Sequence, residues 1–136
     1  NGDTTNNIIS GAAPYWRLAY EYDWGNHSLE VGTSGIYAQL QNPTTPSGLA
    51  LNGSLQHALT DNFTDYGVDG QYQYISDEHQ LTVTAAWTHE RERLNASFLA
   101  FNASNPSDNL NSYNAVASYY WHRKFCASFG IFGVDC

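Results

Sequence analysis

Residues 15–24 read YWRLAYEYDW, in which apolar and polar side chains alternate at every second position. The apolar set is Trp16, Leu18, Tyr20, Tyr22 and Trp24, and the positions between them hold Arg17, Ala19, Glu21 and Asp23. Because successive side chains of a β-strand point to opposite faces, this period of two predicts a strand with one aromatic and one polar face. What the chain can fold into depends on the medium against the aromatic face.

Five further segments show the same alternation, and short turns separate them in a regular order. The predicted strands cover residues 15–24, 29–40, 65–75, 80–90, 110–121 and 125–131. The short connections read GNHS, SDEH and HRK, whereas residues 41–63 and 91–109 form long polar loops, with a helical turn near 55–59 and some order near 98–101. The pattern predicts an all-β fold, an antiparallel up-and-down meander of about six strands.

Short turns and long loops alternate along the chain. This alternation is typical of barrels in the bacterial outer membrane, which have short periplasmic turns and longer extracellular loops. A spanning strand needs only about 9 to 11 residues. A mean hydropathy of −0.45 and the lack of a long apolar run therefore do not exclude a membrane. We expect residues 1–136 to form a single unit, a segment of a transmembrane β-barrel.

Aromatic residues near both ends of the predicted strands form two belts, as amphipathic rings do at the headgroup level of a bilayer. We expect lipid to contact Trp16, Tyr20, Trp24, Tyr66, Tyr74, Trp87, Tyr113 and Trp121. The opposite faces are expected to line a polar lumen with Arg17, Glu21, Asp23, Glu30, Asp69 and Glu90. An acidic wall favours cations, unless Arg17 and a carboxylate simply neutralise one another inside a packed barrel.

A soluble β-sandwich also has strands that alternate, and it is the alternative interpretation. In that case the four tryptophans would be the sugar platforms of a carbohydrate-binding module. The composition favours the barrel, because only 13% of the residues are charged and the polar faces read Gln, Thr, Ser and Gly rather than Lys, Arg and Glu.

The segments APYWRLAYEYDWGNHSLEVGT, FTDYGVDGQYQYISDEH, HERERLNASF, NPSDNLNSY and SYYWHRKF resemble the barrel region of a family of bacterial outer-membrane porin-like proteins, often found alongside multihaem c-type cytochromes. The resemblance covers nearly the whole chain and implies a passive pore or scaffold, or the sheath of a porin–cytochrome electron conduit. Members of the family are longer, and a closed bacterial barrel has at least eight strands. We therefore expect an internal piece of a longer protein, which the opening NGDTT also suggests.

The predicted partners are the lipid bilayer and, by the resemblance, a multihaem cytochrome. The net charge of −8 argues against nucleic acid, and the absence of a CxxCH motif excludes a covalently held c-type haem in this chain. The terminal CASFGIFGVDC departs from the small polar or aromatic residues expected there. Cys126 and Cys136 are ten residues apart, too far along one strand for a disulfide, and Cys126 falls on the lumen side as an inert thiol.

No catalytic role or cofactor is expected. Glu21 and Asp23 share a strand face, but no nucleophile elbow, phosphate-binding loop or metal-ligand set accompanies them. His27, His79 and His122 lie at the short turns, where neighbouring hairpins are about 10 Å apart at about 4.8 Å per strand, too far for one metal ion. We interpret these histidines as polar turn residues.

Overall fold

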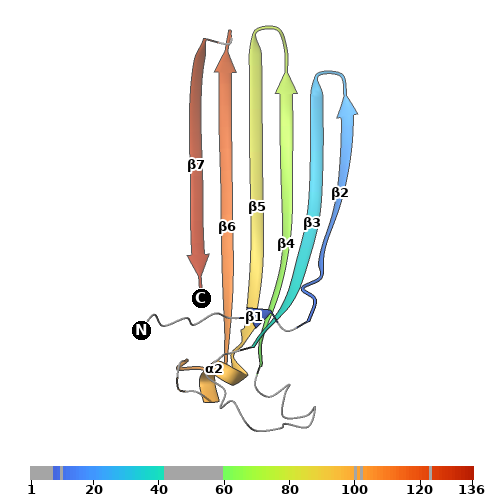
Figure 1. The fold of residues 1–136 in the computed structure, drawn as a ribbon. Helices are drawn as coiled ribbons and strands as arrows, with labels where there is room; N and C mark the ends of the chain where they lie inside the picture. Colours follow the sequence, from blue (N-terminus) through green and yellow to red (C-terminus); the bar gives the residue numbers. More distant parts are fainter. Residues whose placement is uncertain (1–7, 10, 42–59, 100, 102, 123) are drawn as a thin grey trace, which may run out of the picture. The chain divides into compact units, whose positions relative to one another are not determined.

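Six long antiparallel strands, each hydrogen-bonded to the next in the chain, make up most of the structure (Figure 1). In this computed structural model they are β2 (Tyr15–Trp24), β3 (His27–Gln41), β4 (Thr60–Ile75), β5 (His79–Arg93), β6 (Ser107–Trp121) and β7 (Phe125–Asp135). The structure describes residues 8, 9, 11–41, 60–99, 101, 103–122 and 124–136. The predicted all-β, up-and-down antiparallel meander is confirmed.

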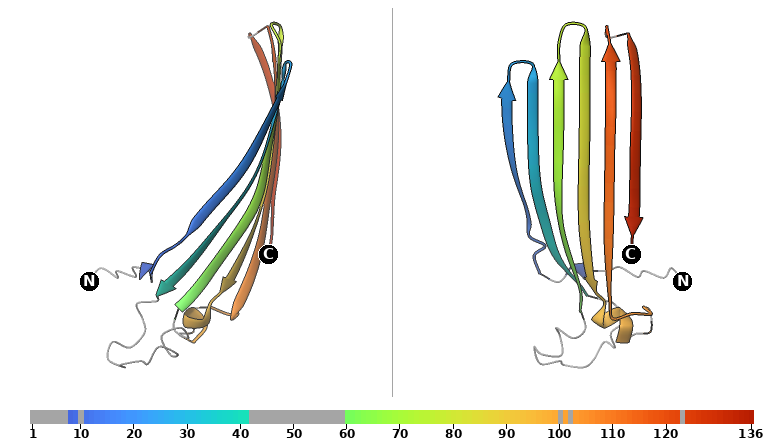
Figure 2. Two further views of the ribbon diagram at one scale, coloured as in Figure 1. Left: turned by 90° about the vertical axis from the view of Figure 1, so that its right-hand side faces the viewer. Right: turned by 180° about the vertical axis from the view of Figure 1, so that it is seen from behind.

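The sheet runs in the order β2-β3-β4-β5-β6-β7, and the views in Figure 2 show the long strands side by side in this order. The two-residue strand β1 (Ile8–Ile9) pairs with the end of β3, where Ile9 lies opposite Leu40. At the other edge, β6 and β7 pair from Trp121 opposite Phe125 to Asn111 opposite Asp135. Within the described residues β2 and β7 each have a single long neighbour, so the sheet is open.

The strands extend further toward the long connections than the sequence predicts. Residues 60–63, 91–93 and 107–109 were expected in loops and belong to β4, β5 and β6, and β7 continues past residue 131 to Asp135. The extensions of β4, β5 and β6 lack apolar alternation, but strand pairing requires only backbone groups, so the side-chain pattern underestimates the length of these strands. The rest of the first predicted loop, including its expected helical turn at 55–59, lies outside the described residues.

The three short turns are close neighbours. Gly25 and Asn26 join β2 to β3, and Gly25 has the positive φ, 58°, that a type II′ hairpin turn requires at its first position. The amide nitrogen of Ile75 donates to the carbonyl oxygen of Asn26 at 2.8 Å, and that of His122 donates to the carbonyl oxygen of Glu78 at 2.7 Å. Short connections therefore occur where the sequence predicts them, although His27 and Ser28 belong to β3 and His79 to β5. We call this end of the strands the turn side.

The chain divides into two compact units that share the long strands. The first contains residues 1–15, 36–65 and 90–109, and the second contains residues 16–35, 66–89 and 110–136. The end of each long strand that leads into a long connection is called the loop side below. Each unit is described separately.

The described residues have almost no interior. Relative exposures are 2% for Ala96, 3% for Thr60 and 6% for Asp61, and no large side chain is fully buried. Large apolar side chains are exposed instead, for example Leu18 at 69% and Phe129 at 72%. The structure describes one sheet, not the two packed sheets of a β-sandwich.

A short helix, α2 (Asn95–Leu99), follows β5 in the first unit and is held by a single buried carboxylate. One carboxylate oxygen of Asp61 accepts hydrogen bonds from the amide nitrogens of Ala96 at 2.8 Å and Ser97 at 3.1 Å. The other oxygen accepts from the Ser97 hydroxyl. The described part of the chain contains no helix long and apolar enough to cross a membrane.

Replacing Asp61 with alanine leaves the buried Ala96 amide without its acceptor. We expect the free energy of local opening at α2 to fall by about 1–3 kcal/mol, the usual cost of such a loss, measured by hydrogen exchange at Ala96 and Ser97. Asp108→Ala is the control, because Asp108 is exposed and its carboxylate accepts, among the described residues, a hydrogen bond from the Asn105 side chain at 3.2 Å and none from α2. Equal exchange in both variants would contradict the assignment.

Candidate functional site

One side of the sheet in the second unit is covered by interacting rings, and we call it the aromatic side. The rings of Trp24 and His27 stack with centroids 5.4 Å apart, and His27 lies 4.9 Å from Tyr74. Further along, Tyr66 contacts Trp87 edge-on at 5.8 Å. These contacts connect β2, β3, β4 and β5 and show that their aromatic residues face the same way.

Two further rings of this side cover glycines of the neighbouring strand. The indole of Trp16 covers Gly35, where an added Cβ would come within 2.6 Å of it. The ring of Tyr113 covers Gly133, its direct partner on β7. Both contacts are the aromatic–glycine pairing that stabilises a glycine within a sheet.

The structure therefore brings together the residues predicted to form the aromatic belts. On β6, Tyr119 contacts the ring of His79, at 6.0 Å between centroids, which places that strand's odd-numbered residues on the aromatic side. All eight predicted residues share this side: Trp16, Tyr20, Trp24, Tyr66, Tyr74, Trp87, Tyr113 and Trp121. All four tryptophans of the chain are among them.

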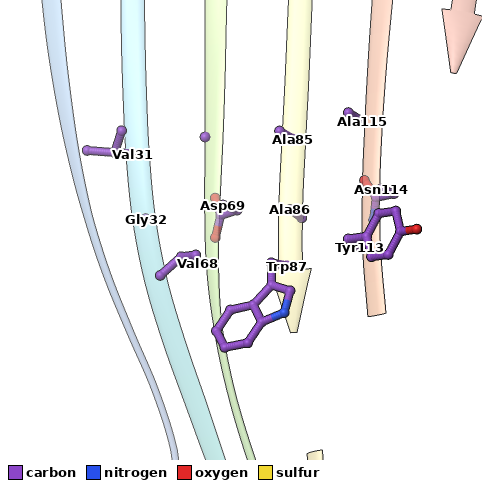
Figure 3. Close-up of a pocket in the computed structure, with 11 residues that line it drawn as sticks. Val31, Gly32, Val68, Asp69, Ala85, Ala86, Trp87, Tyr113, Asn114 and Ala115 are labelled. Atoms are coloured by element: carbon purple, nitrogen blue, oxygen red, sulfur yellow. The ribbon is translucent and has the colours of Figure 1, made fainter. Parts of the chain in front are cut away.

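An apolar hollow of about 550 Å³ lies on the aromatic side of the second unit (Figure 3). The small side chains of Ala85 and Ala115 leave space on β5 and β6, and Trp87 and Tyr113 stand at its loop-side end. Its other lining residues are Val31, Gly32, Val68, Asp69, Gly70, Ala86 and Asn114. No charged side chain of the aromatic side contributes to it, so the hollow fits hydrocarbon rather than a polar ligand.

The opposite, polar side centres on one arginine. The guanidinium of Arg17 on β2 contacts the carboxylates of Glu30 at 3.2 Å and Asp69 at 2.8 Å. Asp69 belongs to β4 and reaches across β3 at Gly32, where an added Cβ would lie 2.9 Å from both carboxylate oxygens. The glycine thus allows an ion pair between strands that are not neighbours.

A hollow of about 320 Å³ adjoins this ion pair. Its polar side chains are those of Arg17, Glu30, Asp69, Gln71, Thr84 and Asn114. The side chains of the pair are more than a third exposed, so solvent screens their attraction and the pair contributes about 0–1 kcal/mol to stability. The ion pair therefore matters mainly for the charge of the surface, because it neutralises one cation between two anions.

The six predicted lumen residues do not form a single group. Arg17, Glu30 and Asp69 meet, and Glu21 accepts a hydrogen bond from the Ser28 hydroxyl at 3.2 Å. Asp23 is exposed near the end of β2. Glu90 belongs to the first unit, where its neighbours are other acids.

These acids, on β4, β5 and β6, all belong to the first unit. Burial raises the pKa of Asp65, and the charge of Glu90 raises it further. The pKa of Glu92 is also raised, first by burial and then by a hydrogen bond and charge repulsion from Glu90, with smaller effects of Asp108 and Asp65. One oxygen of Asp65 is buried without a hydrogen-bond partner in the described part of the chain.

The last strand differs from the others, because both of its faces are apolar. Cys126 and Ser128 lie on the polar side with their side chains 3.7 Å apart, and alternation places Phe132 and Val134 on the same side. Phe132 is 84% exposed and Val134 61%, and on the same side Val116 of β6 lies opposite Gly130, two residues before Phe132. We call Val116, Phe132 and Val134 the apolar patch. The sequence could have indicated that both faces of this strand are apolar, since residues 129–134 contain no polar side chain.

The histidines at the turns are engaged separately. His27 Nδ1 is hydrogen-bonded to the Tyr72 hydroxyl at 2.7 Å, and His79 Nδ1 to the Tyr119 hydroxyl at 2.6 Å. His122 contacts the neighbouring Trp121 ring. Among the described residues no three His, Cys, Asp or Glu side chains are grouped so as to hold a metal ion. Both cysteines are free, at opposite ends of β7.

No protein-family model matches the sequence, and neither the curated proteins nor the solved structures include a significant match.

The role of Gly32 can be tested by alanine substitution. In Gly32→Ala we expect the Asp69 carboxylate to move away from Arg17, since the end of this flexible side chain yields to the new Cβ. Labelling of Arg17 by phenylglyoxal should become faster, while stability changes by no more than about 1 kcal/mol. Gly70→Ala is the matched control, because its Cβ meets nothing nearer than 3.5 Å. Equal labelling of both variants would show that Gly32 does not matter for the ion pair.

The acids of the first unit predict a pH dependence. Because the pKa values of Asp65 and Glu92 are raised, the folded state binds their protons more tightly than the unfolded state, so stability falls as pH rises above their usual 3.8 and 4.5. Hydrogen exchange at Leu94, whose amide donates to the Pro106 carbonyl oxygen at 2.9 Å, should show more protection near pH 5 than near pH 8, after correction for intrinsic rates. Glu92→Gln should reduce this difference, and protection that grows with pH would refute the prediction.

Proposed function

We propose that the chain is a segment of a β-barrel in the bacterial outer membrane, with its aromatic side against lipid and its polar side toward the barrel interior. Its function is that of a passive pore or scaffold, without chemistry of its own. The observation that carries this proposal is the exposure of the aromatic side in a sheet of one layer. Tyr20 is 65% exposed and Trp16 52%, and no protein layer covers them within the described residues.

The free energy of transferring apolar side chains out of water argues against water as the medium on the aromatic side. Transferring one large apolar side chain out of water contributes about 1.5–3 kcal/mol, and whole domains are stable by only about 5–15 kcal/mol. A sheet that leaves many such side chains in water therefore lacks more transfer free energy than the whole stability of a typical domain. Hydrocarbon provides the missing transfer energy and allows a single layer to persist, since the strands satisfy one another's backbone groups.

The spacing of the rings supports a bilayer in particular. In three strands two aromatic residues of the same side are separated by eight positions: Trp16 and Trp24, Tyr66 and Tyr74, and Tyr113 and Trp121. Eight steps cover about 27 Å along a strand, or about 21 Å across a membrane at a tilt of about 40°, close to the apolar band of about 25 Å in such barrels. We propose residues 16–24, 29–37, 66–74, 79–87, 113–121 and 125–133 as the spanning segments, which leaves the acidic group of the first unit outside.

The polar side supports a cation-favouring interior. Arg17 is neutralised between Glu30 and Asp69, and this group retains one net negative charge. Glu21 and Asp23 add further carboxylates on β2. A wall of this charge attracts cations and repels anions.

A second candidate is a barrel wall that encloses a protein partner, and the apolar patch favours it. Phe132 and Val134 would face water in an open lumen, at the same energetic cost as on the aromatic side. A strand that is apolar on both faces is typical of one covered on both faces. The resemblance to porin-like proteins found alongside multihaem cytochromes supports such a cytochrome as the enclosed partner.

Quenching of tryptophan fluorescence tests the proposal, because all four tryptophans lie on the aromatic side. In vesicles of brominated phosphatidylcholine the emission should be strongly quenched, whereas acrylamide in the water should have little effect. The matched pair is a variant that retains only Trp87 and a second in which Trp87 is replaced by phenylalanine and Thr84, on the polar side of the same strand, by tryptophan. The second should not be quenched by bromine. Acrylamide quenching of Trp87, with no bromine effect, would end the proposal.

The same approach separates the two candidates. A single tryptophan in place of Phe132 should be accessible to acrylamide in an open pore. In a barrel purified with its partner it should be protected from both quenchers.

A further inference from the structure

The sequence HERER, at the loop-side end of β5, separates its charges by sign. Glu90 and Glu92 share one side of the strand by alternation and are half-buried, and the charge of Glu90 acts on Asp65 of β4. Alternation places Arg91 and Arg93 on the other side, where both are exposed. Glu90 and Glu92 are thus neighbours of the arginines in the sequence, but among the described residues no ion pair joins them.

Within the described residues neither guanidinium has a partner: the ion pairs of arginine all belong to Arg17, and no side-chain hydrogen bond of Arg91 or Arg93 is found. Each guanidinium carries five N–H donors in a planar fork that fits phosphate oxygens in pairs. Residues two apart on one strand side are about 6.6 Å from each other, so both forks can contact one phosphate group or two adjacent ones.

The position of the arginines along β5 indicates where the phosphate comes from. Arg91 and Arg93 lie four and six residues beyond Trp87, on the same side of the strand. At a tilt of about 40° this places their backbone about 10 and 15 Å further along the membrane normal than Trp87, and flexible arginine stems can bend back toward the headgroups. A soluble phosphate has no reason to concentrate at this level, whereas lipid headgroups are present there at high density.

We infer that Arg91 and Arg93 bind the phosphate groups of lipids in the leaflet on the loop side. This inference rests on the proposed function, because it needs the aromatic side to face lipid. It adds a chemical preference to that contact: the protein selects lipids with an anionic phosphate headgroup and is fixed at a defined depth by them. The ion pairing is charge-assisted at both groups, which is the stronger class of hydrogen bond.

The test compares two lipids that differ only by the phosphate. The full protein is reconstituted in phosphatidylcholine vesicles that contain equal small amounts of phosphatidic acid and diacylglycerol, and native mass spectrometry counts the lipids it retains. We expect phosphatidic acid to be retained in preference. In Arg91→Gln/Arg93→Gln this preference should fall by about fivefold or more, since both charge-assisted contacts are lost.

Glu90→Gln/Glu92→Gln is the matched control, because it changes the same strand on its other side. It should keep the preference, which shows that the side of the strand matters and not its net charge alone. Millimolar inorganic phosphate in the buffer should leave the ratio unchanged. Loss of the preference with inorganic phosphate would assign the arginines to free phosphate and overturn the lipid assignment.

The outcomes separate this inference from the proposed function. A protein that retains lipid and has bromine-quenched tryptophans, but shows no phosphate preference, refutes the role of the arginines and leaves the barrel proposal intact. A protein that retains no lipid and has unquenched tryptophans refutes both. Equal losses in the arginine and glutamate variants would also overturn the inference.

Discussion

The single-layer sheet is the constraint on which everything else depends. A globular domain buries the apolar face of each sheet against another layer, and that burial provides most of its stability. Here the described residues provide no such layer, and the rings of Trp16, Tyr20 and Phe129 are exposed. We therefore infer that contact between the sheet and its surrounding medium contributes to the stability of the fold. The residues on each face then indicate which kind of medium contacts that face.

The alternation of side chains along a strand then separates sequence neighbours of different polarity or charge, because it places them on opposite faces. On β2 it separates Trp16 from Arg17, and on β5 it separates Arg91 and Arg93 from Glu90 and Glu92. Cross-strand contacts join like with like: rings stack across strands on one side, and the Arg17 ion pair connects three strands on the other. Each face of β2 to β5 in the second unit is thus chemically similar from strand to strand, although each of these strands carries both apolar and polar residues.

The sequence predicted this division well because it depends on local order alone. The period of two identified which aromatic residues share a side, and Gly25 marked a tight turn. The approach of Asp69 to Arg17 across Gly32 could not be predicted, since it depends on the pairing of strands far apart in the sequence. The same holds for Asp61, which holds a helix more than thirty residues away, and for the strand ends, where pairing continues without an apolar pattern.

The two candidate functions differ in what they require of β7. An open pore needs a polar interior on every strand, and β2, β3 and β4 meet this requirement with Arg17, Glu30 and Asp69. Phe132 and Val134 do not, and their strand lies at an edge of the described sheet, where the backbone also lacks a partner. An edge strand that is apolar on both faces is prone to aggregation unless it is covered. If further strands pair with this edge in the proposed barrel, they satisfy its backbone but leave the apolar patch facing the interior, so the proposal of an enclosed apolar partner accounts for the patch and the proposal of an open pore does not.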